Sequence, residues 1–308
     1  MRFCKLSSII LAVAVVCYAV VAQAVTIETV PIGNAGNAAD TSGYGAVGYN
    51  YNIGKYEVTA GQYTAFLNAK ANVSDTYGLY NSNMWNDTYS GCMIQQTSIP
   101  GGYTYSVAAD YANRPVNYVS YWDSLRFANW LGNDQGTGDT ETGAYTLTSA
   151  GIGNNTIARN TDWKWAVTSE DEWYKAAYYK GGDLYSLYAN GTSTAPVAGT
   201  TGSNYNWAIG STWDGTINGA LEQNGTKDMM GNVWEWNESI VYSSSRGLRG
   251  GDWGDYSDYL AASHRDDSYP AYGGSVVGFR VASVPEPGSI TLLVCGAIAC
   301  LMWWRRHK

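Results

Sequence analysis

The stretch Asp228–Ser239, "DMMGNVWEWNES", places a glutamate between two tryptophans, directly after a Gly-Asn turn and an aspartate. We expect the indoles of Trp234 and Trp236 to pack in the interior while the Glu235 carboxylate turns the other way. A carboxylate held between core positions must be hydrogen-bonded, paired with a positive charge or bound to a cation. The stretch therefore predicts that Glu235 is a buried anchor or an ion ligand and not a catalyst.

The amino-terminal residues 1–24 have the composition of a targeting segment. Arg2 and Lys5 precede an apolar run over 6–21, and Ala22-Gln23-Ala24 supplies small residues at a cleavage site. This order is typical of a secretory signal peptide, which we expect to be cut after Ala24. An uncleaved anchor helix is the alternative. The sequence therefore predicts an exported protein.

The carboxyl-terminal residues 285–308 combine a Pro-Glu-Pro entry, an uncharged apolar run over 290–304 and the basic residues Arg305, Arg306 and Lys308. The run is shorter than the roughly 20 residues that span a bilayer comfortably. Composition alone predicts a membrane anchor with its basic end in the cytoplasm. The order of parts also resembles the PEP-CTERM sorting signal of bacterial envelope proteins, which implies an exosortase as partner. A plain single-pass anchor remains the alternative.

The segment between these ends, residues 25–284, is predicted to be one acidic domain. It carries all but one of the chain's 26 acidic residues, but only thirteen of its eighteen lysines and arginines. Nucleic-acid binding is disfavoured, because phosphate contacts need a basic surface. Cys92 is the single cysteine of the segment. We therefore expect neither an intrachain disulfide nor a thiolate pair for a metal in it.

Regular elements are few in this segment. Thr59, Ser120 and Ser169 each stand at a helix start, with a residue that completes a capping box three positions later. Short strands are predicted over 163–167, 248–253 and 277–282, and long polar loops over 132–143 and 189–206. This combination predicts a mixed α+β fold whose loops are held by side-chain bonds or ions.

Five stretches together resemble the formylglycine-generating enzyme (sulfatase-modifying factor) family, whose core is an elaborated C-type lectin fold. They occur in the family's order: "GKYEVTAGQYTAFLNA" at 54–69, "RPVNYVSYWDSLRFANWL" at 114–131, "SEDEWYKAAYYKGG" at 169–182, "DMMGNVWEW" at 228–236, and "LRGGDW…HRDD…GFRVA" within 248–282. The Arg-Leu-Pro-Thr that usually precedes the third stretch is here Ala-Val-Thr-Ser at 166–169. The resemblance implies the family's fold over nearly all of residues 25–284.

The resemblance implies an oxidase chemistry whose ligands this chain lacks. Family enzymes oxidise a sulfatase cysteine to formylglycine with copper held by two thiolates, and soft thiolates are the ligands that Cu(I) prefers. The two cysteine positions correspond here to Asp255 and Leu260. His264 is the only histidine of the segment, so a histidine cluster for iron is also absent. We therefore expect no copper and no formylglycine-generating activity.

The resemblance also implies structural calcium sites. Its first site would take the carboxylates of Asp228 and Glu235 and the carbonyls of Gly231 and Val233, and its second site would take Asn204 and Tyr205. Oxygens from one curved segment suit a cation that accepts six to eight of them. The alternative for Glu235 is that it accepts backbone N–H groups or pairs with Arg249 or Arg280.

Residues 252–274, "DWGDYSDYLAASHRDDSYPAYGG", contain the expected ligand-binding surface. Tyrosine offers large contact area at low entropy cost, and short polar side chains offer adaptable hydrogen bonds. The candidate ligand-binding residues are Asp255, Tyr256, Asp258, Tyr259, His264 and Arg265. A glycan or a protein would be the ligand.

Three functions stay open at this point. The first is an exported, non-catalytic, calcium-stabilised binding or structural module of the cell envelope or extracellular matrix. The second is a divergent enzyme of the same superfamily, oxidoreductase-like or hydrolytic, that uses His264, Asp255 and Asp258. The third is a surface protein without a specific ligand.

Overall fold

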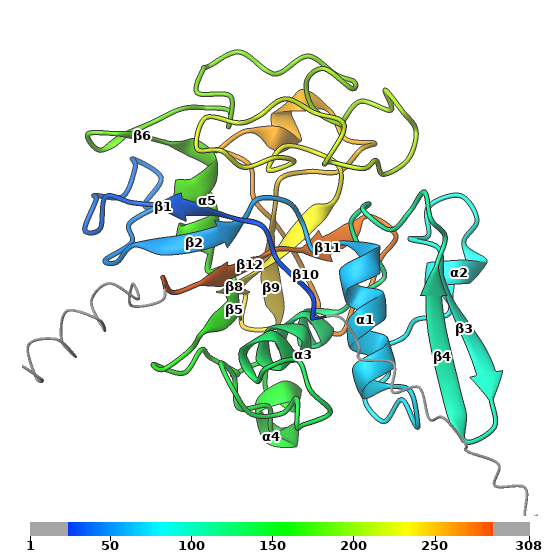
Figure 1. Ribbon diagram of the computed structural model, residues 1–308. Coiled ribbons are helices and arrows are strands. Elements are labelled where there is room, and N and C mark those ends of the chain that lie inside the picture. The colour runs from blue at the N-terminus through cyan, green and yellow to red at the C-terminus, as the bar shows by residue number, and fades with distance from the viewer. Residues whose placement is uncertain (1–23, 286–308) are drawn as a thin grey trace, which may run out of the picture.

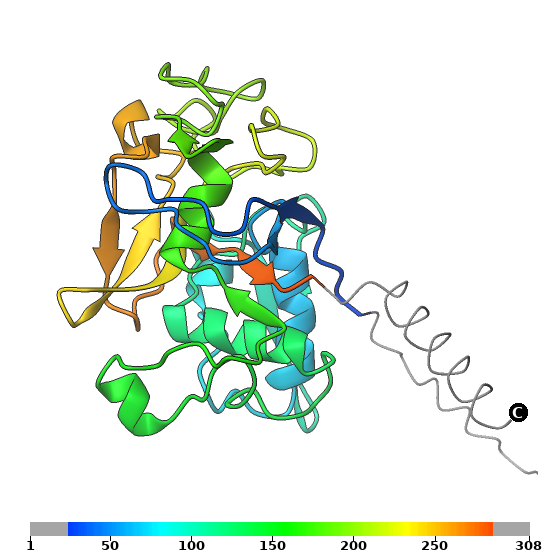
Figure 2. The ribbon, with the colours of Figure 1, turned by 90° about the vertical axis from the view of Figure 1, so that its left-hand side faces the viewer.

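The computed structural model describes residues 24–285, which form a mixed α+β domain (Figures 1 and 2). Apart from Ala24 and Pro285, the predicted signal peptide and the predicted sorting segment lie outside the described residues. Within 24–285, no helix has the length and apolarity that a bilayer crossing needs. The predicted α+β class is confirmed.

Two four-stranded sheets form the centre of the domain. The first has the antiparallel order β1 (Thr29–Ile32), β2 (Tyr51–Gly54), β12 (Val281–Ser283), β5 (Trp165–Val167). The second has the order β10 (Asp266–Ser268), β9 (Ser245–Arg249), β8 (Trp234–Val241), β11 (Val277–Phe279), and only its β11–β8 pair is parallel. Two hairpins complete the strands: β3 (Ile94–Ile99) with β4 (Gly102–Val107), and β6 (Tyr179–Gly181) with β7 (Leu184–Tyr185).

The helices are α1 (Ala60–Lys70), α2 (Asn83–Asn86), α3 (Tyr121–Gly132), α4 (Ser149–Gly153), α5 (Glu170–Tyr178) and the 3₁₀ helix η1 (Ser257–Leu260). All three predicted capping boxes are present, at Thr59, Ser120 and Ser169. The sequence predicted that the third helix would run to Gly181. It ends at Tyr178 because the next residue, Tyr179, is already extended and begins β6.

Burial on both faces of β8 explains why its sequence did not predict a strand. Trp234, Glu235, Trp236 and Asn237 are all buried, so this half of the strand shows no alternation of apolar and polar side chains. Both tryptophans pack, as predicted, in the larger core cluster around α1 and α3. A second cluster forms around α5 and contains Trp173. β8 therefore runs between two cores.

The loops over 189–228 are joined to β8 through the Gly-Asn turn. Asn204 forms a parallel bridge with Gly231, whose φ is +86°. A Cβ on Gly231 would lie 2.0 Å from the Asn204 carbonyl oxygen. Glycine is therefore required here both by the left-handed backbone and by the close approach of a second chain segment.

We predict that Gly231→Ala destabilises the domain far more than Gly36→Ala. Gly36 has a similar φ of +80°, but a Cβ there would meet nothing within 4 Å. Both variants incur the left-handed strain of about 1–2 kcal/mol, and only Gly231→Ala adds a clash worth about 1–3 kcal/mol. Urea unfolding of both variants measures the difference; equal losses would contradict the packing described here.

Candidate functional site

Glu235 is paired with Arg280, and both side chains are fully buried. Arg280 donates from Nη2 to Oε1 at 2.6 Å and from Nε to Oε2 at 2.6 Å. The indole Nε1 of Trp173 also donates to Oε2, at 2.8 Å. The remaining Arg280 donors reach the carbonyls of Gly54 and Lys227. Of the partners that the sequence left open for Glu235, the structure contains the Arg280 pair, whereas Arg249 binds Glu170.

Three more buried acids lie near this pair. Asp228 accepts from Trp213 Nε1 at 3.0 Å, Glu57 accepts from Asn232 at 3.0 Å, and Glu222 accepts from the backbone of Met229. Burial raises the pKa of Asp228 to about 7 and that of Glu222 to about 8, and it also raises the pKa of Glu57 well above its usual value. Among the described residues, Arg280 is the one guanidinium whose charge is felt by all three.

The predicted calcium ligands fit a cation only in part. Asp228 Oδ2 and Asn204 Oδ1 are buried oxygens without a hydrogen-bond partner, which is what a hard cation would use. Both Glu235 oxygens are instead occupied. Within residues 24–285, no three His, Cys, Asp or Glu side chains are grouped as a metal site. A calcium site here would therefore depend on Asp228, Asn204 and backbone carbonyls such as those of Gly231, Val233 and Tyr205.

Asp255 and Leu260, the two positions that the resemblance assigns to the family's cysteines, have different surroundings. Leu260 is fully buried in the second core cluster at the end of η1. Asp255 is half-buried, and its Oδ2 accepts from the backbone N–H of Asp252 at 3.0 Å. Cys92 is the free thiol of the described residues; it is buried in the other core cluster, and burial raises its pKa to about 12. A buried, protonated thiol without a second one beside it cannot hold copper as a thiolate pair.

Asp252 and Asp255 form a carboxylate pair beside exposed aromatic rings. Burial and the neighbouring carboxylate raise the pKa of Asp252 to about 6, and burial raises the pKa of Asp255. The ring of Trp207 stands edge-to-face on that of Trp253, at 4.7 Å between centroids and 88° between planes. Tyr89 packs on Trp253 from another side. We call this group, Tyr89, Trp207, Asp252, Trp253 and Asp255, the acid–aromatic site.

Close packing brings the aromatic and acidic parts of this site together. A Cβ added to Gly254 would lie 3.2 Å from the Trp207 ring and 3.2 Å from Asp252 Oδ1. Trp207 is 57% exposed, and its backbone N–H donates to the Trp253 carbonyl at 2.9 Å. The Asp252 carboxylate, which is 9% exposed and accepts from the Gly254 N–H at 2.6 Å, therefore lies just beneath the exposed indole.

The other predicted ligand residues divide into two groups. The rings of Tyr259 and His264 lie 4.5 Å apart at a tilt of 49°, and both contact Trp234. His264 is close enough to Asp255 to favour its ionised form. Tyr256 and Asp258 are exposed. Arg265 pairs with Glu170 at 2.7 Å, so its guanidinium is already used within the domain.

Trp207, Trp253, Asp252 and Tyr89 were not predicted as site residues. Trp207 and Tyr89 are far from residues 252–274 in sequence, and only the folded loops bring them there. Two consecutive left-handed residues, Asn206 and Trp207, turn the chain at this point. No local pattern of residues predicts such a turn without glycine.

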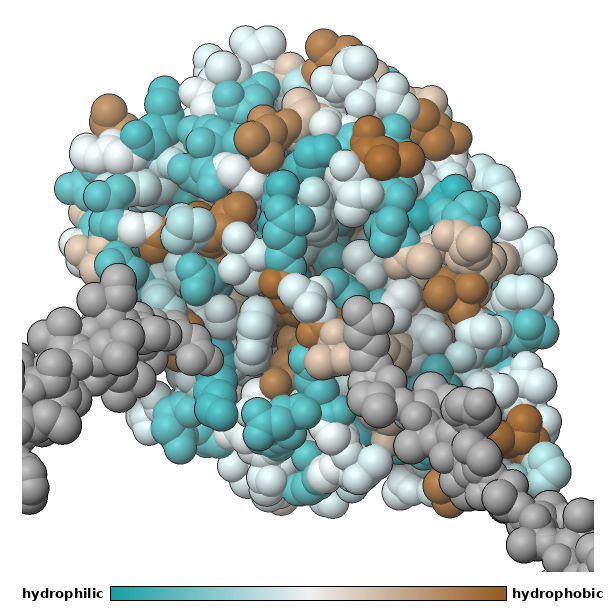
Figure 3. Space-filling model, viewed as in Figure 1, coloured by the Kyte–Doolittle hydropathy of each residue, from teal (hydrophilic) through white to brown (hydrophobic). Residues whose placement is uncertain are grey.

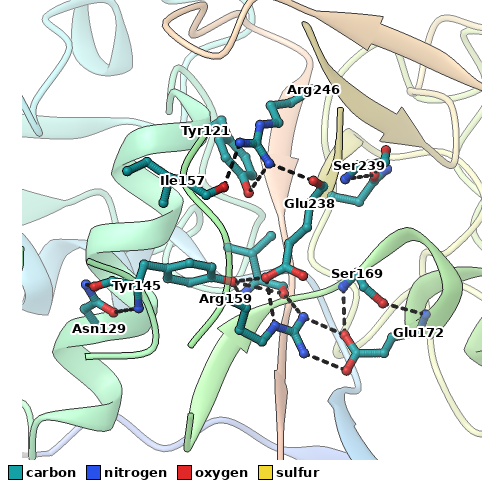
Figure 4. A network of polar contacts seen from close by, with 12 residues as sticks. Tyr121, Asn129, Tyr145, Ile157, Arg159, Ser169, Glu172, Glu238, Ser239 and Arg246 are labelled. Atoms are coloured by element: carbon teal, nitrogen blue, oxygen red, sulfur yellow. Dashed lines mark hydrogen bonds and ion pairs between the residues drawn. The ribbon is translucent and has the colours of Figure 1, made fainter. Parts of the chain in front are cut away.

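A second buried polar network, shown in Figure 4, has its groups satisfied by one another. Arg159 donates to Glu172 and Glu238 at 2.8 Å, and the Glu238 carboxylate also accepts from the Tyr145 hydroxyl. Arg246 donates to the carbonyls of Ile157 and Glu238. This network joins strands and loops; Arg246 is 1% exposed and is held by uncharged acceptors, so the network presents no charge at the surface for a ligand.

We predict that Glu235→Gln lowers the free energy of unfolding by about 3–5 kcal/mol, because it removes the one carboxylate within residues 24–285 that is hydrogen-bonded to the buried Arg280. Glu28→Gln is the matched control, since the Glu28–Lys55 pair is largely exposed and such pairs contribute about 1 kcal/mol or less. Chemical denaturation of both variants gives the two values. A small loss at Glu235 would show that the pair is not the anchor described above.

Comparisons with known proteins agree with the family resemblance seen in the sequence. Residues 33–284 match the family model described as "Sulfatase-modifying factor enzyme 1-like domain". Among solved structures, Treponema denticola variable protein 1 is similar with a TM-score of 0.56 and 20% identity, over 86% of this chain and 97% of that one. CarF is similar with a TM-score of 0.54 and 19% identity, over 85% and 99%. At these identities the two structures show the fold alone. No curated protein matches the chain.

Proposed function

Because the chain belongs to the family of sulfatase-modifying factor enzyme 1-like domains, we propose that it keeps the family's scaffold as a non-catalytic ligand-binding module outside the cell. The observation that carries the proposal is the pair of positions Asp255 and Leu260. A hard carboxylate and an apolar side chain replace the two soft ligands that the resemblance requires for copper. The acid–aromatic site beside Asp255 is the surface that would hold the ligand, for which a glycan is the best candidate.

The arrangement of the domain supports this role. Figure 2 shows the two ends of the described residues on the right of the molecule, and η1 and β10 on its left. Both ends also border one groove, lined by Ile27, Ser283 and Val284. If the carboxyl-terminal segment holds the protein at the envelope before an exosortase acts on it, the segment over 252–274 faces away from the attachment. Ligands in the surrounding matrix would then reach it.

The surface in Figure 3 is predominantly hydrophilic, with apolar residues scattered among polar ones. Such a surface suits an exported protein whose acidic charge keeps it soluble. The absence of a broad apolar face on this side also favours a polar ligand over a hydrophobic partner.

We predict that the purified full-length chain, supplied with copper and oxygen, forms no formylglycine on a sulfatase peptide. A copper-dependent family enzyme is the positive control for the same peptide. Mass spectrometry of the peptide detects the aldehyde. Aldehyde formation, or stoichiometric copper or iron in the purified protein, would overturn the non-catalytic assignment and favour the divergent enzyme.

Calcium is the second part of the proposal. Asp228 Oδ2 would bind an ion at the first site with the carbonyls of Gly231 and Val233, and Asn204 Oδ1 would bind one at the second site with the Tyr205 carbonyl; an ion at the first site would offset charge among the buried acids near Arg280. Ca²⁺ accepts such mixed carboxylate, amide and carbonyl oxygens. Bound calcium would stabilise the loops over 204–233, which contain few regular elements of their own.

We predict that a chelator lowers the thermal midpoint by about 5–10 °C, since an ion at 100 times its Kd adds about 2.7 kcal/mol. Asp228→Asn should abolish this response, and asparagine tolerates the left-handed φ of +58° at this position. Asp162→Asn, at an exposed acid, is the control that should keep it. Differential scanning calorimetry reads the shift, and melting that ignores the chelator would remove calcium from the proposal.

A further inference from the structure

We propose that the acid–aromatic site binds an amino sugar that carries a free ammonium group. This inference rests on the proposed function and narrows its ligand to a class. Three features of the site point to it: a carboxylate pair whose one basic neighbour in the described part of the chain is His264, beside Asp255, an exposed indole, and a buried indole N–H without an acceptor.

The charge of the site is the first feature. Asp252 and Asp255 have side chains in contact, and each is a hydrogen-bond acceptor when ionised. All seven ion pairs found among residues 24–285 use glutamates, so no lysine or arginine there pairs with either aspartate. Like charges in contact at a partly buried site require a proton or an external cation between them. An ammonium group supplies both the positive charge and N–H donors.

The exposed ring of Trp207 is the second feature. It stands on Trp253 and beside the Asp252 carboxylate, so a ligand held by the acids would lie against its face. The C–H face of a pyranose ring packs well on such an indole, and a nearby ammonium gains cation–π attraction from it. Tyr89, whose ring packs edge-to-face with that of Trp253, extends the aromatic surface.

The third feature distinguishes a sugar from a simple amine. Trp253 is 4% exposed, and its Nε1–H has no hydrogen-bond partner among the described residues. An unmade hydrogen bond at a buried donor costs about 1–3 kcal/mol. Because this N–H is buried, the exposed Trp207 or Tyr89 ring that packs on Trp253 would have to move aside for a sugar hydroxyl oxygen to accept from it. A lysine side chain has no acceptor to offer, and a neutral sugar has no charge for the acids.

The test is calorimetric binding of the purified full-length chain to three probes: an oligomer of glucosamine, the same oligomer fully N-acetylated, and a lysine-containing peptide. We expect the glucosamine oligomer to bind at least tenfold more tightly than either of the others. Trp207→Ala and the double variant Asp252→Asn, Asp255→Asn should each weaken that binding at least tenfold. Asp162→Asn removes an exposed carboxylate elsewhere and should leave binding unchanged.

Each other outcome overturns the inference in a recognisable way. Equal binding of the acetylated oligomer would remove the ammonium requirement while leaving a glycan-binding module. Equal or tighter binding of the lysine peptide with the same variant profile would make the ligand a polypeptide. Failure of all three probes would reject the site's assignment without restoring catalysis, which the sulfatase-peptide assay decides separately. Trp207 is exposed, so its variant should fold even if the double aspartate variant does not.

Discussion

The buried pair of Glu235 and Arg280 is the interaction that holds the two sheets, α5 and the long loops together. Glu235 lies on β8 between the two core clusters, and Arg280 lies between β11 and β12, where the chain passes from one sheet to the other. Through Trp173 the pair reaches α5, and through the Gly54 and Lys227 carbonyls it reaches β2 and the long loops. A charge buried at this junction cannot be solvated by water, so every segment that contacts it is held in a fixed arrangement.

Further arginine–glutamate pairs stabilise other parts of the domain where helices and strands are short. Glu170 binds both Arg249 and Arg265, and Arg159 binds Glu172 and Glu238 (Figure 4). Strands of three to five residues form few ladder hydrogen bonds, and the backbone of long loops must find other partners. Arginine has five donors in a planar fork, so one side chain can satisfy a carboxylate and several carbonyls at once. These pairs hold the loops that α-helices and longer strands hold in other folds.

Sequence reasoning predicted the features that local patterns encode. The caps at Thr59, Ser120 and Ser169 were predicted because side chain and backbone lie within three residues of one another. β8 was missed as a strand because burial on both faces removes the alternation that marks one. The partner of Glu235 was left open between two arginines, since the choice depends on which strand β8 contacts. Trp207 gave no signal at all, because its role comes from a contact with a distant loop.

Glutamates and aspartates have separate tasks in this domain, and the separation bears on function. Each of the seven ion pairs among residues 24–285 joins an arginine or lysine to a glutamate, whose longer side chain reaches across layers. No aspartate takes part in any of these ion pairs, and of the glutamates outside them, Glu57 and Glu222 are buried. Asp252 and Asp255 place two carboxylates next to the exposed ring of Trp207. Carboxylates are hard acceptors, which suit a charged polar ligand better than a soft redox-active metal.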